Sequence, residues 1–259
     1  MLLAVDIGNS SIGFGLFDGD GHLQKKWKVS ALPARTADEY AVLVSGLLQL
    51  HGVSRQEVTD CILSSVVSTL TRDLRSTLQL LFGVRVLEVG PGIKTGLNIR
   101  IESQTELGAD LVSNAVATLA QFAPPAVIVD IGTATTFTVL GKDGSLEGAV
   151  IAPGLRMSMD ALSAGASELP DASLVPPKRL IGKNSRDSMN IGVLYGQAFQ
   201  IDGFLDRFRQ TLHAETLCAV ATGGLAGTVL PFCKQNFLHC PDLTLQGLYH
   251  LWKKNTASI

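Results

Sequence analysis

The sequence predicts an α/β protein made of two similar lobes, each a mixed β-sheet with helices. An apolar strand followed by Asp-Ile-Gly occurs at Asp6 and again at Asp130, 124 residues further along the chain. In both copies small hydroxyl residues, a strand, an Asp-Gly turn and a second strand follow. Such an internal repeat at half the chain length indicates two lobes, expected at residues 1–122 and 123–259, with a boundary near Phe122–Pro125.

The composition is typical of a globular protein. The 259 residues are 46% hydrophobic and 17% charged, enough to build a sizeable core. A net charge of -2 and a pI near 6.2 give no electrostatic footprint for nucleic acid. Lys25, Lys26 and Lys28 form a short basic run, which we interpret as a solvated strand end.

Neither a leader peptide nor a membrane span is expected. The apolar start Leu2–Val5 is short and meets Asp6, which is typical of a buried first strand and not of a signal peptide. No apolar run approaches the roughly 20 residues that a membrane helix needs. The four cysteines lack the paired spacing of a zinc site and suit a reducing compartment. We therefore expect a cytoplasmic protein that does not bind membranes.

The first lobe opens with an antiparallel meander. Strands are expected at Leu2–Val5, Ile12–Phe17 and His22–Val29, with a hairpin turn at the Asp-Gly pairs of residues 18–21. This start is unlike a dinucleotide-binding fold, where a helix follows the first strand directly. Apolar spacing then predicts, in order, helix Asp38–Gln49, strand Cys61–Ser65, helix Thr69–Phe82, strand Val84–Val89 and helix Gly108–Phe122.

The second lobe repeats the meander with strands at Ala126–Val129, Phe137–Leu140 and Leu146–Ala152, the last two joined by a turn at residues 141–144. The remaining elements expected, in order, are helix Arg156–Ser167, a Pro-rich loop at Pro170–Arg179, a polar turn at Gly182–Ser185, helix Met189–Thr211, strand Leu217–Ala221 with a glycine turn at Thr222–Leu225, and helix Gln246–Lys254.

The turn Asp6–Ser10 carries a chemical signal. A glycine turn after a strand exposes successive backbone N–H groups, and such concavities bind phosphate. A carboxylate beside phosphate makes sense where it holds a hydrated Mg²⁺. A tight hairpin with Asp as turn former is the alternative reading. The second copy at Asp130–Thr133 and a third glycine turn at Gly223 and Gly224 favour nucleotide binding.

Asp110 permits two interpretations. It stands at the first turn of an apolar helix, where a carboxylate caps the backbone or complements the helix dipole. It could equally accept the proton of a hydroxyl that attacks a γ-phosphate. Spacing alone favours the cap.

Over its whole length the sequence resembles the type III pantothenate kinases. The segments that carry the resemblance appear in the family's order: Asp6–Ser10, Gly90–Leu97, Glu106–Asp110 with Asn114–Ala117, Asp130–Phe137, Gly148–Leu155, Gly182–Ser185 with Ser188 and Met189, Gly192, Tyr195 and Gly196, Ala221–Leu225, and Asp242–Leu245 with Gly247 and Leu248.

This resemblance implies an actin-like (ribonuclease H-like) fold, a homodimer, and ATP-dependent phosphorylation of pantothenate to 4'-phosphopantothenate in coenzyme A biosynthesis. It also implies Mg²⁺ and a monovalent cation, K⁺ or NH₄⁺. By position, Asp110 is the general base, Asp130 binds the monovalent cation, and Asp6 holds Mg²⁺ through water. The ATP contacts implied are Asp6, Ile7, Gly8, Asn9, Ser10, Ser11, Ile12, Gly13 and Thr133. The pantothenate contacts implied are Ile101, Gly108, Ala109, Asp110, Leu111 and Ser185.

The chain departs from the family's pattern in the implied acceptor site. Leu111 stands where the family usually has Arg, and Ile101 where it usually has Tyr, while Ser185 keeps the hydroxyl of the usual Thr. Two alternatives therefore stay open: a kinase of the same fold with a different hydroxyl acceptor, or a catalytically weakened regulatory paralogue. Retention of Asp110 argues against the latter, because a protein that does not catalyse needs no base.

Overall fold

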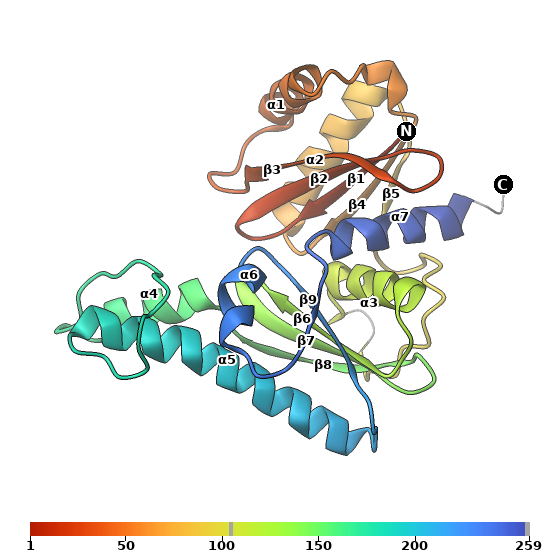
Figure 1. Cartoon of the computed structure of the whole chain (residues 1–259). Helices are drawn as coiled ribbons and strands as arrows, with labels where there is room; N and C mark the ends of the chain where they lie inside the picture. Colours follow the sequence, from red (N-terminus) through yellow and green to blue (C-terminus); the bar gives the residue numbers. More distant parts are fainter. Residues whose placement is uncertain (104–105, 257–259) are drawn as a thin grey trace. The chain divides into compact units, whose positions relative to one another are not determined.

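The computed structural model describes residues 1–103 and 106–256, and it consists of two compact units (Figure 1). The first unit comprises Met1–Gly96, Glu102–Ala120 and Asp242–Ile259, and the second comprises Leu97–Ile101 and Gln121–Pro241. Each unit has one mixed five-stranded sheet that carries helices. The predicted α/β class is confirmed.

The sheet of the first unit has the strand order β3-β2-β1-β4-β5. Strand β1 pairs antiparallel with β2 and parallel with β4, so the opening meander continues into a parallel half-sheet. The strands are β1 (Leu2–Ile7), β2 (Ser11–Phe17), β3 (Leu23–Ser30), β4 (Asp60–Ser65) and β5 (Val86–Glu88).

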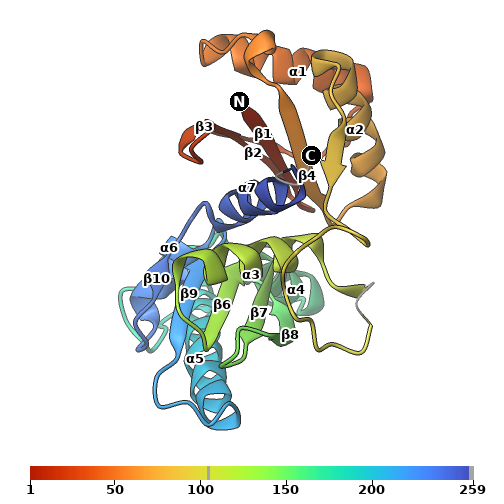
Figure 2. The same cartoon turned by 90° about the vertical axis from the view of Figure 1, so that its right-hand side faces the viewer.

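Helices cover both faces of this sheet. Alternate residues of the strands, such as Leu3, Val5 and Phe14, form a buried core with α1 (Ala37–Leu50) and α2 (Ser68–Phe82). The other face contacts α7 (Leu243–Thr256), the last helix of the chain (Figure 2). Helix α3 (Ala109–Gln121) belongs to the same unit, as does the short η1 (Arg55–Glu57).

The second unit repeats this order as β10-β9-β6-β7-β8. Its main core lies on one face of the sheet, where apolar side chains of β6 and β7 pack against α4, α5 and α6. The elements are β6 (Ala126–Ile131), β7 (Ala134–Leu140), β8 (Leu146–Pro153), α4 (Leu155–Gly165), α5 (Ser185–Thr211), β9 (Cys218–Thr222), α6 (Ala226–Val229), η3 (Leu230–Phe232) and β10 (Leu238–His239).

The internal repeat extends to burial. All residues of strands β1 and β6 are buried except the fifth, Asp6 and Asp130, which are partly buried. Strands β2 and β7 also share one burial pattern, and both sheets have a register shift at the far end of the second strand, at Leu16 and Phe17 in one and at Val139 and Leu140 in the other. The two aspartates therefore occupy equivalent places in their sheets.

The two units differ in two places from the lobes expected at residues 1–122 and 123–259. Helix α7 belongs to the first unit because it covers that unit's sheet. Residues Leu97–Ile101 belong to the second unit because their backbone bonds to β8. Arg100 N donates to the Leu146 carbonyl at 2.9 Å, and the Arg100 guanidinium pairs with Asp143 at 2.6 Å and Glu147 at 2.8 Å.

Helix α5 begins four residues before the expected start at Met189, so Ser185 is its first residue and not part of a turn. The reason is local. The Asn184 side chain accepts a hydrogen bond from Asp187 N at 2.8 Å and caps the helix. The last helix likewise begins at Leu243, ahead of Gln246. Among the described residues, no helix is long and apolar enough to cross a membrane.

Candidate functional site

The turn between β1 and β2 is short and exposed. Gly8 N donates to the Ser11 carbonyl at 3.0 Å, and Asn9 and Ser10 lie at the surface. The end of β3 flanks this turn, because Ala31 N donates to the Ser10 carbonyl at 3.1 Å. The backbone of the turn is therefore held in place and accessible to a ligand.

Asp6 carries its carboxylate just before this turn. The hydroxyl of Ser64, the neighbouring residue on β4, donates to Asp6 Oδ1 at 2.6 Å. Burial is the main cause that raises the pKa of Asp6 to about 6, and the negative charge of Asp110 adds to the rise. The Ser64 hydrogen bond and the positive charge of Lys28 oppose it. Three polar groups of the same unit, Ser64, Asp110 and Lys28, therefore act on the Asp6 carboxylate.

Asp110 belongs to the same unit and lies close enough to Asp6 to affect its pKa. It is the second residue of α3, so it lies in the first turn, as expected of a partner of the helix dipole, but it is not the capping residue that precedes the helix. Leu111 N donates to Asp110 Oδ1 at 2.9 Å. Burial raises the pKa of Asp110. The structure therefore brings together two carboxylates that are 104 residues apart in the sequence.

Helix α3 is held against α7, which fixes the start of the helix that bears Asp110. A Cβ atom at Gly247 would collide with the Ser113 carbonyl, so the two helices touch at their backbones. Beside this contact, the Thr244 hydroxyl donates to Asn114 Oδ1 at 2.8 Å. Leu111 is only 6% exposed.

The second unit brings its own two glycine turns together. Gly132 N donates to the Ala134 carbonyl at 3.0 Å, and Leu225 N donates to the Ile131 carbonyl at 2.9 Å. Gly223 has φ +93, and a Cβ atom there would collide with the Asp130 carboxylate. The two turns can therefore pack closely only because residue 223 has no side chain.

The remaining predicted residues are divided between the units. Thr133, next to the Asp130 turn, is exposed and belongs to the second unit. Ile101, half-buried, and Ser185, exposed at the start of α5, also belong to the second unit. Gly108, Ala109 and Leu111 lie with Asp110 in the first.

Sequence reasoning missed two residues of the first site, Ser64 and Lys28. Ser64 lies near the carboxyl end of β4, the buried strand that runs parallel to β1. Because ligand sites form at the carboxyl ends of parallel strands, the predicted strand order could have pointed to Ser64. Lys28 requires the register of the meander, which places it opposite Gly13. Neither is part of a recognisable local motif.

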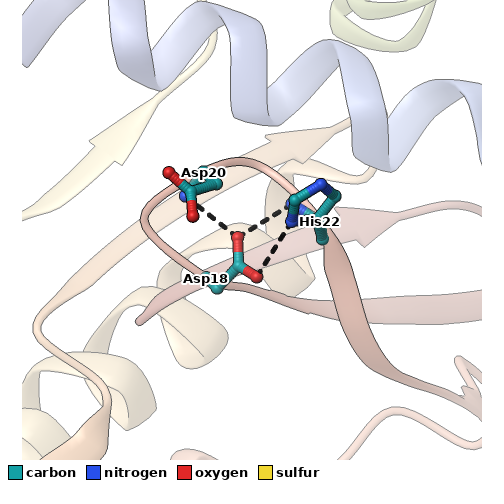
Figure 3. Close-up of side chains that lie close together, drawn as sticks. All are labelled: Asp18, Asp20 and His22. Carbon is teal, nitrogen blue, oxygen red and sulfur yellow. Dashed lines mark hydrogen bonds and ion pairs between the residues drawn. The ribbon is translucent and has the colours of Figure 1, made fainter.

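A second group of potential ligands, Asp18, Asp20 and His22, lies in the exposed turn between β2 and β3 (Figure 3). Asp18 Oδ1 accepts from the backbone N–H groups of Asp20 at 3.0 Å and His22 at 2.9 Å, and its Oδ2 accepts from Gln24 Nε2 at 2.7 Å. These bonds close the hairpin, which explains the cluster without a metal.

Solved structures with similar folds cover nearly the whole chain. A Baf family transcriptional activator from Campylobacter jejuni matches with a TM-score of 0.62 and 18% identity, over 98% of this chain and 99% of that one. A 2-dehydro-3-deoxygalactonokinase from Sinorhizobium meliloti matches with a TM-score of 0.61 and 14% identity, over 98% and 99%. At these identities the similarity shows the fold alone, the actin-like fold of sugar kinases.

The sequence comparisons are more specific. The family model for type III pantothenate kinase matches residues 2–207. The type III pantothenate kinase of Moorella thermoacetica is 41% identical over 99% of this chain and 100% of its own length. That of Geotalea daltonii is 42% identical over 100% of both chains. The chain belongs to the type III pantothenate kinase family.

Proposed function

We infer that the chain transfers the γ-phosphoryl group of ATP to pantothenate, the first step of coenzyme A biosynthesis. The observation that carries this function is the full-length similarity, at 38–42% identity, to proteins of that name. Each position to which the family's resemblance assigns a carboxylate, Asp6, Asp110 and Asp130, is occupied by an aspartate in this chain.

Asp110 is proposed as the general base. The pantothenate hydroxyl oxygen bonds to the γ-phosphorus, the bond from that phosphorus to the ADP oxygen breaks, and the hydroxyl proton moves to the Asp110 carboxylate. Burial raises the pKa of Asp110, which makes its carboxylate a stronger base than an exposed aspartate. The Leu111 N–H fixes one carboxylate oxygen and leaves the other for the substrate hydroxyl.

The segment Asp6–Gly13 is proposed to bind the phosphates, with Asp6 holding Mg²⁺ through water. The donor set fits: two carboxylates, Asp6 and Asp110, lie close enough that their repulsion raises a pKa, and a hard divalent cation would relieve it. Bound there, Mg²⁺ would neutralise charge on the phosphates. Ser64 would keep the Asp6 carboxylate oriented through its hydrogen bond.

In the second unit we propose that Asp130 binds a monovalent cation, K⁺ or NH₄⁺, and that Thr133 contacts the nucleotide. The fit rests on the close approach of the Gly223 turn to the Asp130 carboxylate, which a side chain at residue 223 would displace. Oxygen ligands such as this carboxylate suit a hard cation. Omitting K⁺ and NH₄⁺ from the assay, with Na⁺ in their place, should lower the rate.

The acceptor site is proposed to include Ile101, Gly108, Ala109, Leu111 and Ser185. One observation favours a second candidate acceptor, a hydroxyl compound less acidic than pantothenate: Leu111, where the family usually has Arg, is buried and apolar. An apolar side chain offers a carboxylate no hydrogen-bond partner. Such a site would therefore have a weaker preference for an anionic acceptor over an uncharged one.

We also propose a cytoplasmic homodimer. The second unit exposes large apolar side chains on and near α4 and α5, of the kind that a subunit interface covers: Met157, Leu162, Leu180, Ile181 and Phe199. Sedimentation of the purified chain should give twice its mass of 27.4 kDa. A species of single-chain mass at micromolar concentration would contradict the dimer.

One assay tests the activity. Purified protein, ATP, Mg²⁺, K⁺ and pantothenate should give phosphopantothenate, and Asp110→Ala should reduce the rate by about 10²-fold or more. Asp20→Ala, which removes an exposed carboxylate of the β2–β3 hairpin, is the control and should stay near the parent rate. Turnover with another hydroxyl acceptor but not pantothenate would support the second candidate. ATP binding without turnover would support a regulatory paralogue.

A further inference from the structure

One row of side chains crosses the sheet of the first unit at the level of Asp6. The pairing aligns Ser64 on β4 with Asp6 on β1, Asp6 with Gly13 on β2, and Gly13 with Lys28 on β3. Directly opposed residues of neighbouring strands place their side chains on one face of the sheet. Ser64, Asp6 and Lys28 therefore share a face, and the hydrogen bond from Ser64 to Asp6 agrees with this.

Gly13 leaves the row open between Asp6 and Lys28. Among the described residues, the neighbour within 4 Å of a Cβ atom built there would be the Asp6 Cβ alone, at 4.0 Å. Neighbouring strands are about 4.8 Å apart, so the Asp6 and Lys28 backbones are separated by roughly 10 Å. A lysine side chain can span much of that gap across a glycine.

The next lysine on the same face has a different role. Lys26 lies opposite Gly15, where a Cβ atom would touch Leu245 of α7, and its ammonium pairs with both oxygens of Asp242 at 2.8 Å. Lys28 is exposed and forms no ion pair with any described residue. Lys26 fastens β3 to the start of α7, whereas the charge of Lys28 remains available beside the turn.

We propose that Lys28 is a phosphate-binding residue, whose ammonium crosses Gly13 and binds oxygens of the β- and γ-phosphates of ATP at the Asp6 turn. The proposal rests on the proposed function, which places those phosphates there. Two carboxylates of this unit, Asp6 and Asp110, would repel the nucleotide, and one divalent ion offsets only part of that repulsion. Lys28 supplies a fixed positive charge on the same face, and the basic run is then more than a solvated strand end.

The test measures nucleotide affinity by calorimetry with Mg²⁺ and without pantothenate. Lys28→Ala should weaken binding of a non-hydrolysable ATP analogue and of ADP by about tenfold or more, while Lys28→Arg should restore most of it. Lys25→Ala is the matched control: it removes the same charge from the same strand but from the opposite face, and its affinity should stay within about twofold of the parent.

The kinetic readout separates this role from a general loss of structure. In Lys28→Ala the KM for ATP should rise and kcat should fall, with the KM for pantothenate unchanged. Equal affinity for ATP and ADP in Lys28→Ala and the parent would overturn the proposal while leaving the proposed function intact. An equal loss in Lys25→Ala would overturn it too, because the effect would then be one of net charge. A parent chain without nucleotide affinity would overturn both.

Discussion

The ionised carboxylate of Asp6 costs the folded state stability, although the proposed site needs this charge. Its pKa is raised from 3.8 to about 6 in the folded chain, mainly by burial. Between those two values the folded state binds a proton that the unfolded state has lost, so stability falls as the pH rises through this window. Above pH 6 the charged carboxylate costs at most about 3 kcal/mol, a large share of a typical domain stability.

We therefore predict that Asp6→Asn is more stable than the parent at pH 7.5, by about 1–3 kcal/mol, because the buried charge is gone. The gain should disappear near pH 4, and the kinase activity should be lost. Urea unfolding of both proteins at pH 7.5 and pH 4 measures this difference in stability. Asp18→Asn is a control of opposite sign: hydrogen bonds lower the pKa of Asp18, so that variant should lose stability at pH 7.5.

Ile101 and Leu111, the two residues of the proposed acceptor site that differ from the family's usual ones, lead to a second prediction at the residue scale. Ile101→Tyr with Leu111→Arg should lower the KM for pantothenate, since both changes restore residues usual in the family and Arg offers a carboxylate a bidentate partner. Because Leu111 is 6% exposed, the Arg variant should also unfold more easily than the parent. An unchanged or higher KM for pantothenate in a folded double variant would refute this interpretation of both departures.

The residues of the first site were only partly predictable. Asp6 and Gly8 belong to a local turn pattern that indicates phosphate binding, whereas the base role of Asp110 came only from the family resemblance. Ser64 and Lys28 reach Asp6 only through strand pairing, and a register is a property of the folded sheet. The pKa of Asp6 likewise depends on burial and on neighbours from three other strands or helices, which no local pattern contains.

At the scale of elements, the turn after β9 is constrained by sterics at Gly223. Gly223 combines a left-handed φ with the closest approach to Asp130 and to the Ile131 carbonyl. An alanine there would have to move either the turn or the Asp130 carboxylate. The Gly223 turn therefore packs directly on the Asp130 turn, although the two are about 90 residues apart in sequence.

Gly223→Ala should accordingly destabilise the protein by about 1–2 kcal/mol from the backbone alone. It should also weaken the activation by K⁺, because the displaced carboxylate is the proposed ligand. Gly227→Ala is the control: its Cβ atom would meet nothing within 4 Å, and residue 227 is helical. That variant should be neutral or slightly more stable. Unaltered K⁺ activation in Gly223→Ala would count against Asp130 as the cation ligand.

Strand and helix types were predictable because both meanders have strong local signals, whereas helix starts were not. The cap at Asn184 and the early start of α7 at Leu243 depend on side-chain bonds and on packing partners. Strand β10, two residues long, carries too little pattern to be recognised.

At the scale of the whole molecule, the two structural units are not two consecutive halves of the chain, because the first unit includes the C-terminal helix. A cut at residues 122 and 123 follows the repeat, but α7 covers the second face of the first sheet. Leu245 approaches Gly15, and Tyr249 stacks on Phe17, so removing α7 would expose part of that apolar face. The sequence repeat marks where the two similar halves begin, whereas burial decides which unit a helix completes.

A fragment experiment tests this assignment. Residues 1–122 alone should unfold without cooperativity or aggregate, because an uncovered sheet face remains. The same fragment joined through a Gly/Ser linker to residues 242–256 should show a cooperative urea transition by circular dichroism. Equal cooperativity in both fragments would show that α7 is dispensable for the first unit.

The placement of α7 also has a consequence during synthesis. Proteins usually fold from the N-terminus as they leave the ribosome, at about 5–20 residues per second. Here the first unit waits for the final helix, so its strands emerge early and stay incomplete for roughly 10 s while the second unit is translated. The nascent chain should therefore complete its later-made half first, and in that interval the unfinished sheet is a natural substrate for chaperones.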